Sequence, residues 1–115
     1  MKKIECIIQP SKLIALEDRL VGLVSGLTVY QVNGFGAQKG DTHYHRGEPL
    51  LVQKKSKVKL EMVVPDHKVE EVVNLLIDIC CTGKIGDGKI FILPVEEVIR
   101  IRTGARGEKA LLPEE

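Results

Sequence analysis

The sequence predicts an α+β fold made of two βαβ units. Two stretches, residues 4–32 and 59–93, share one layout. Each has a strand-like run, a proline followed by a capping residue, an amphipathic helix, a glycine and a second strand-like run. The alternative is an α+β domain with two unrelated helices, but the matched order of five features favours a duplicated unit.

Each element of the two units has its own signal. The first strands end at Pro10 and Pro65, and Ser11 and Asp66 are the expected helix N-caps. The apolar helix stripes are Leu13, Leu16, Leu20 and Val24, then Val69, Val72, Val73, Leu76 and Cys80. Gly26 and Gly83 stand where C-caps are expected, and "LTVYQV" and "KIFIL" close the units. Together, these elements predict a ferredoxin-like βαββαβ sandwich in one domain, residues 1–115, with both helices on one face of a four-stranded antiparallel sheet.

The strand at 57–64 shows how the sheet divides. Val58, Leu60, Met62 and Val64 alternate with Lys57, Lys59, Glu61 and Val63. The helices cover one face only, and Val63 with one set from "IECII" leaves apolar residues on the other. We expect a second copy of the chain to cover that face, the alternative being scattered surface hydrophobes.

Composition and charge argue against several classes of function. A net charge of +1 and a small "KKSKVK" cluster without aromatic residues argue against nucleic-acid binding. No apolar run is long enough to span a bilayer, so direct membrane insertion is not expected. The first ten residues lack a signal-peptide pattern, and three cysteines do not form a disulfide framework. These features favour the cytoplasm.

A long connection separates the two units. Residues 37–55 have no clean period and lie between two predicted strands, which is typical of a functional or mobile loop; an unstructured insertion is the alternative. We interpret the mixed apolar and basic tip as a docking surface for a partner. Asp41, His43 and His45 alternate and could bind a metal, but a closed site needs about four ligands, so solvated histidines are expected.

The segment "TGKIGDGKIF" at 82–91 is the strongest candidate for anion binding. It is neither GxxxxGK[ST] nor GxGxxG, so its glycines alone are a weak signal. However, Arg100 and Arg102 would face one side of a strand in "VIRIRTG", and Lys89 and the amides of Gly86 to Gly88 could bind the same anion. An ion pair with Glu96, Glu97 or Glu108 is the alternative for the arginines.

These segments, with "VNGFGAQKGDTHYHRG" and the opening "MKKIECIIQPSKL", resemble the PII signal-transduction proteins over nearly the whole chain. The resemblance implies a homotrimer with ATP or ADP in the clefts between neighbouring subunits and 2-oxoglutarate beside Mg-ATP. It also implies that the loop at 37–55, the T-loop, docks on a transporter, enzyme or regulator, and it leaves 104–115 as a C-terminal tail.

The resemblance assigns site residues by position. Gly86, Asp87, Gly88 and Lys89 would hold phosphates, and Arg100 and Arg102 would reach them from the neighbouring subunit. Around the adenine and ribose it places Thr28, Glu61, Met62 and Val63, partly through backbone atoms. At the loop base it places Gly34, Gly36 and Gln38, with Gln38 contacting Mg²⁺ and 2-oxoglutarate and Lys57 pairing with the far carboxylate.

Several positions depart from the family pattern, and these departures bear on nucleotide preference and on modification of the T-loop. Ala37 replaces a frequent basic residue, which predicts weaker ATP binding relative to ADP. Leu50 stands at the tyrosine that many bacterial members nucleotidylate and Glu48 at the cyanobacterial phosphoserine, so neither modification is expected. A divergent sensor of adenine nucleotide plus another small ligand, such as bicarbonate, is the alternative. An enzyme is not expected, since Asp87 is the only carboxylate near the predicted phosphates.

Overall fold

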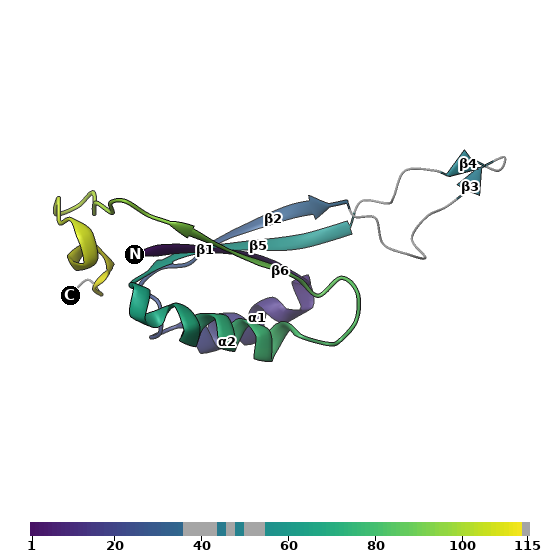
Figure 1. The fold of residues 1–115 in the computed structure, drawn as a ribbon, viewed down its shortest axis with the longest axis horizontal. Coiled ribbons are helices and arrows are strands. Elements are labelled where there is room, and N and C mark those ends of the chain that lie inside the picture. Colours follow the sequence, from purple (N-terminus) through teal and green to yellow (C-terminus); the bar gives the residue numbers. More distant parts are fainter. Residues whose placement is uncertain (36–43, 46–47, 50–54, 114–115) are drawn as a thin grey trace.

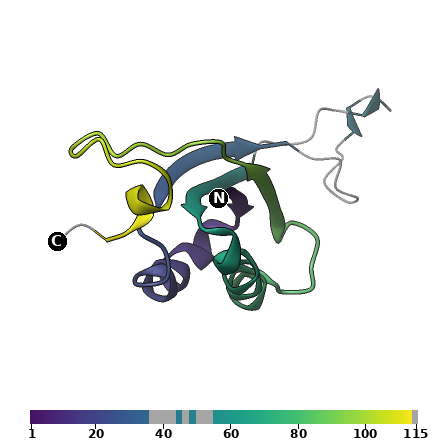
Figure 2. The same cartoon turned by 60° about the vertical axis from the view of Figure 1, so that its left-hand side comes forward.

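Four antiparallel strands form a sheet in the order β2-β5-β1-β6. The computed structural model describes residues 1–35, 44–45, 48–49 and 55–113. The sheet strands are β1 (Lys2–Ile8), β2 (Thr28–Gly34), β5 (Lys55–Val64) and β6 (Gly88–Pro94). The helices α1 (Leu13–Leu20) and α2 (Val69–Cys80) lie side by side on one face of the sheet (Figures 1 and 2). The predicted ferredoxin-like α+β fold is confirmed.

A second, two-stranded sheet lies in the long connection. Its strands are β3 (Tyr44–His45) and β4 (Glu48–Pro49), and Tyr44 pairs with Pro49. The sequence pattern predicted no strand there. Strand β5 begins at Lys55, two residues before the predicted start. The remaining residues from 36 to 54, which include Gly36 and Gln38, lie outside the described residues.

The core lies between the sheet and the two helices. The predicted inward set of β5, residues Val58, Leu60, Met62 and Val64, is buried. Strand β1 adds Ile4, Cys6 and Ile8, and the helices add Leu16, Leu20, Val69, Val72, Leu76 and Cys80. Each buried aliphatic or Met side chain of this set contributes roughly 1.5–3 kcal/mol by leaving water. The alternation in β5 therefore predicted its core residues correctly. Of the predicted helical stripes, Leu13, Val24 and Val73 are only partly buried, and Val24 lies beyond the end of α1.

The predicted helix caps are wrong. Ser11 and Asp66 lie inside short 3₁₀ turns, Pro10–Lys12 and Asp66–Lys68, that precede the helices. The 3₁₀ turns already use two amides near the helix starts, since Lys12 N donates to Gln9 O at 3.0 Å and Lys68 N to Pro65 O at 3.0 Å. The C-caps are Val21 and Cys81, both with extended ψ, rather than Gly26 and Gly83.

The chain continues past β6 into a tight turn and a third 3₁₀ segment, Gly107–Leu111. Residues 98–104 do not form the predicted strand. Ile99 and Arg106 make an isolated antiparallel bridge, and the backbone turns between them with Arg100 N donating to Ala105 O at 2.9 Å. Gly104 has a φ of 71°, which allows this reversal. The assumption that Arg100 and Arg102 share one side of a strand is therefore incorrect.

Candidate functional site

Residues 81–87 connect α2 to Gly88, the first residue of β6, at one end of the sheet (Figure 1). Gly83, Gly86 and Gly88 have φ values of 81°, 102° and 115°, a region that side chains disfavour. A Cβ on Gly88 would lie 1.7 Å from the backbone oxygen of Ile7. The glycines therefore serve the turn from helix to strand and the close approach of β6 to β1.

Asp87 holds this loop together from within. Its Oδ2 accepts hydrogen bonds from Thr82 N at 2.7 Å and Gly83 N at 3.0 Å, and its Oδ1 accepts one from the Thr82 hydroxyl. The Thr82 hydroxyl bond is the main cause that lowers the pKa of Asp87, followed by the Thr82 amide. The Asp87 carboxylate thus contacts the start of the loop, and its role in the geometry is to fix Gly86 and Gly88.

The Gly86 carbonyl joins three parts of the chain. It accepts hydrogen bonds from Lys57 Nζ and from Gln9 Nε2, both at 2.8 Å. Gly34 lies at the same end of the sheet, since it pairs with Lys55 and a Cβ on it would be 3.4 Å from Lys57 Cγ. The structure therefore brings together Gly34, Lys57 and the glycine loop, and we call this group the loop end.

Gln9 is a member of the loop end that sequence reasoning missed. It follows Ile8, which pairs with Val58 on one side and with Gly88 on the other. Only the strand register could have placed Gln9 in the site, because Gln9 is distant in sequence from both Lys57 and Gly86. A polar residue just past a central strand, at the end where two predicted site segments meet, is a candidate for the site.

A second group of predicted residues lies at the opposite end of the sheet. Thr28 pairs with Glu61, and the pairing of β2 with β5 stops there. Met62 and Val63 continue along β5 without a β2 partner. The Met62 side chain is buried, so Met62 can offer a ligand only backbone groups. An open stretch of strand backbone with alternating donors and acceptors suits the edge of a nucleobase.

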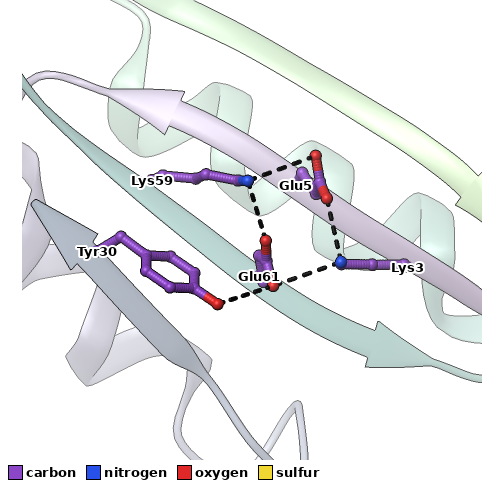
Figure 3. A network of polar contacts seen from close by, with 5 residues as sticks. All are labelled: Lys3, Glu5, Tyr30, Lys59 and Glu61. Carbon is purple, nitrogen blue, oxygen red and sulfur yellow. Dashed lines mark hydrogen bonds and ion pairs between the residues drawn. The ribbon is translucent and has the colours of Figure 1, made fainter. Parts of the chain in front are cut away.

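Glu61 belongs to a charged network on the face of the sheet that the helices leave uncovered (Figure 3). Its carboxylate lies 3.0 Å from Lys59 Nζ and 3.4 Å from Lys3 Nζ, and it accepts a hydrogen bond from the Tyr30 hydroxyl at 3.3 Å. The Lys59 contact is the main cause that lowers the pKa of Glu61. Glu5 closes the network at 3.1 Å from Lys3 Nζ. The centre of this face is therefore charged rather than apolar, with Val63 near its edge.

Arg100 and Arg102 lie in the turn beyond β6. Arg100 Nη2 donates to three carbonyl oxygens, those of Lys109 at 3.3 Å, Ala110 at 3.5 Å and Leu112 at 2.6 Å. Glu97, one of the expected ion-pair partners of these arginines, lies 3.7 Å from Arg106 Nη1. We call the turn, with Thr28, Glu61, Met62 and Val63, the arginine end.

The two ends cannot meet in one chain. Strand β6 runs from Gly88 to Pro94 between them, which corresponds to about 20 Å of extended backbone. Figure 1 shows the glycine loop and the turn that carries the arginines at opposite ends of the sheet. The predicted site residues that the structure describes therefore fall into two separate groups in each chain, the loop end and the arginine end, which we call half-sites.

The described residues show neither a metal-binding cluster nor a membrane-spanning helix. Within residues 1–35 and 55–113, no group of three or more His, Cys, Asp or Glu side chains is placed to hold a metal ion. Asp41, His43 and Gln38 lie outside the described residues. Neither described helix has the length and apolar character needed to cross a bilayer.

Comparison with known proteins decides the family. Residues 1–105 match the family model for "Nitrogen regulatory protein P-II". The chain belongs to the P-II family. It is 49% identical to Nitrogen regulatory protein P-II of Haemophilus influenzae and 50% identical to that of Nostoc punctiforme. It is 48% identical to Nitrogen regulatory protein P-II 1 of Escherichia coli. Each alignment covers 96% of this chain and 100% of the P-II relative.

Proposed function

We propose that this P-II protein is a signalling regulator that binds ATP or ADP between neighbouring subunits of a homotrimer. The observation that carries the proposal is the separation of the two half-sites. Each half-site has groups suited to one part of a nucleotide, yet one chain cannot bring them together. A neighbouring copy supplies the missing half, so assembly and nucleotide binding depend on each other.

The loop end is suited to the phosphates. Gly86 and Gly88 present backbone amides in a turn that Asp87 fixes, and Lys89 follows on β6. Phosphate oxygens favour such fixed amides together with a cation. Arg100 and Arg102 of the next subunit would add two more cations. The affinity of the site for a nucleotide would then depend on the number of its phosphates, so ATP and ADP would bind differently.

The arginine end is suited to the base and the ribose. The backbone of Met62 and Val63 beyond the end of β2 would pair with the adenine edge, and Thr28 lies next to it. Glu61 would approach the sugar, but its carboxylate is already bound to Lys59 and Lys3. We therefore expect Glu61 to contribute mainly through the position of its backbone and through the charge balance of the face.

Lys57 is the group we assign to 2-oxoglutarate. Its ammonium donates to the Gly86 carbonyl at 2.8 Å, a neutral acceptor that a ligand carboxylate can replace with a charge-assisted bond. Gln38 would complete this site and contact Mg²⁺, which keeps most of its ligands from water and phosphate. Ligand occupancy next to Gly34 would then set the conformation of the T-loop, residues 37–55, and hence its affinity for a target protein.

A sensor of adenine nucleotide plus a different small ligand is the second candidate function. Ala37 and the T-loop sequence around Leu50 favour it, because these positions depart from the family pattern. In both readings the protein is a regulator rather than an enzyme. Phosphate release from ATP that Lys89→Ala abolishes would contradict that conclusion.

Calorimetric titration tests the proposal. We expect heat from ADP and from Mg-ATP, and further heat from 2-oxoglutarate only after Mg-ATP is bound. Heat from the nucleotides but none from 2-oxoglutarate would favour the second candidate, with bicarbonate as the next titrant. No heat from either nucleotide, in protein shown by light scattering to be oligomeric, would contradict both. Pull-downs with ADP and with Mg-ATP plus 2-oxoglutarate would then compare the target proteins.

A further inference from the structure

The segment after the arginine turn, residues 107–113, begins with the 3₁₀ turn Gly107–Leu111 and contacts Arg100, which we assign to phosphate binding. All three of the carbonyl acceptors of Arg100 Nη2 come from this segment. A terminal guanidinium nitrogen carries two N–H groups. With Leu112 O at 2.6 Å and two more acceptors within 3.5 Å, these donors are engaged by the segment.

The segment itself is weakly held beyond Gly107. Gly107 N donates to Val98 O at 2.9 Å and to Glu97 Oε1 at 3.0 Å, so the start of the segment is fixed to the turn. After that point Ala110 and Leu111 are half-buried, and Glu108, Lys109, Leu112 and Pro113 are exposed, with Leu112 60% exposed. Release of residues 108–113 would therefore expose mainly the side chains of Ala110 and Leu111, while the anchor at Gly107 would stay in place.

Phosphate and the segment would compete for the same donors. Hydrogen bonds from a guanidinium to phosphate are stronger than those to a neutral carbonyl. The phosphates of a nucleotide bound at the neighbouring subunit's loop end would thus displace the carbonyls of Lys109, Ala110 and Leu112 from Arg100 Nη2.

We infer that residues 108–113 form an autoinhibitory latch on Arg100, released when nucleotide binds. This inference rests on the proposed function, since it assigns Arg100 to the phosphates. By reciprocity, any change that removes the latch must tighten nucleotide binding, and nucleotide binding must loosen the latch. The C-terminal segment would then report nucleotide occupancy in addition to the T-loop.

The test replaces residues 108–113 by a Gly/Ser sequence of equal length. This replacement keeps the chain length, puts no new terminal carboxylate near Arg100, and removes Glu108 and Lys109 together, so the net charge is unchanged. We expect ADP and Mg-ATP to bind roughly threefold to tenfold more tightly, the range for one or two exchanged hydrogen bonds. In the Arg100→Ala background the same replacement should change the affinity by less than twofold. Equal or weaker binding in the chain that keeps Arg100 would overturn the inference, and weaker binding would assign the segment to positioning Arg100.

A second measurement examines the latch without nucleotide. Leu112 N donates to Lys109 O at 3.3 Å, so its amide exchange reports the order of the segment. Arg100→Ala should speed this exchange in nucleotide-free protein, and ADP should speed it in the wild type. If Arg100→Ala leaves the exchange unchanged, the latch is absent even where nucleotide binds normally. If the exchange responds to Arg100→Ala but no nucleotide binds, the proposed function fails, and with it the role of the contact as a nucleotide latch.

Discussion

The two ends of the sheet hold their functional groups in different ways. At the loop end the backbone carries the geometry, with glycines at positive φ, Gly88 against Ile7 and Asp87 bound to the start of its own loop. At the arginine end, a side-chain cation lies in a turn and contacts a partly exposed segment. The first arrangement is fixed by strand pairing, whereas the second can change its contacts without disturbing the core. We therefore interpret the loop end as a rigid receptor and the arginine end as its adjustable partner.

Substitution at Gly88 should have the largest effect. Gly88→Ala places a Cβ 1.7 Å from the Ile7 oxygen at a φ of 115°, so β6 must move away from β1. We expect the free energy of unfolding to fall by about 3 kcal/mol or more, measured by urea denaturation. Gly26→Ala is the matched control, because a Cβ there meets nothing within 4 Å and the backbone is not at positive φ. Equal stability of the two variants would show that the loop end is not rigid.

The next largest effect is expected at Lys89. Lys89→Gln removes the cation that follows the glycine loop, which should weaken ADP and ATP binding by roughly 10-fold or more, the usual value of a charge-assisted hydrogen bond. Lys84→Gln, in the same exposed loop, is the control for net charge and should change affinity by less than threefold. Calorimetry or a fluorescent nucleotide gives both numbers. If the two variants weaken binding equally, general charge rather than the position of Lys89 attracts the nucleotide.

A smaller and local effect is expected at Asp87. The bonds from Thr82 lower its pKa, so its contribution to loop order is present above its usual value near 3.8 and is lost as the pH falls through the lowered folded-state value. The amide NMR shifts of Thr82 and Gly83 should therefore titrate with a midpoint below 3.8. Asp87→Asn should abolish that titration and weaken ADP binding a few-fold. A midpoint at or above the usual carboxyl value would contradict this account of the loop.

The smallest effect is expected at Glu61, the residue of the arginine end that lies in the charged network. Its pKa is lowered, chiefly by Lys59, so it stabilises the fold above its usual value of 4.5, and this stabilisation is lost as the pH falls through its folded-state pKa. Glu61→Gln should lower the urea midpoint slightly at pH 7, and the difference should shrink on acidification to pH 3. A difference that grows at low pH would contradict the assigned role of the network.

Sequence patterns predicted the features that depend on local periodicity. The alternation in β5 and most positions of the helical stripes placed core residues, and the repeated order of elements placed the four strands. The helix caps failed because turns after Pro10 and Pro65 satisfy backbone donors that Ser11 and Asp66 were expected to satisfy. The "VIRIR" alternation failed because Gly104 reverses the chain immediately after it.

For the candidate site, the sequence proposes residues but not their contacts. The family resemblance proposes Lys57, Gly86 and Arg100 as site residues, whereas the contacts that these residues make depend on the fold. Gln9 reaches Gly86 only because β1 lies between β5 and β6. The charged centre of the uncovered face appears only when the register sets Glu5 opposite Glu61, with Lys3 and Lys59 between them. Side-chain contacts between distant segments are not encoded in the periodicity of any one segment.

The most direct test of the central claim is complementation between two defective chains. Lys89→Ala damages the loop end and Arg100→Ala the arginine end, so oligomers of either variant alone should bind ATP weakly. In mixed oligomers, formed by co-expression and verified by native mass spectrometry, some pairs of neighbouring chains would join an intact loop end to an intact arginine end. We predict that these mixed oligomers contain a class of sites with wild-type affinity. Mixed oligomers that bind ATP no better than the parent variants would contradict a site shared between two chains.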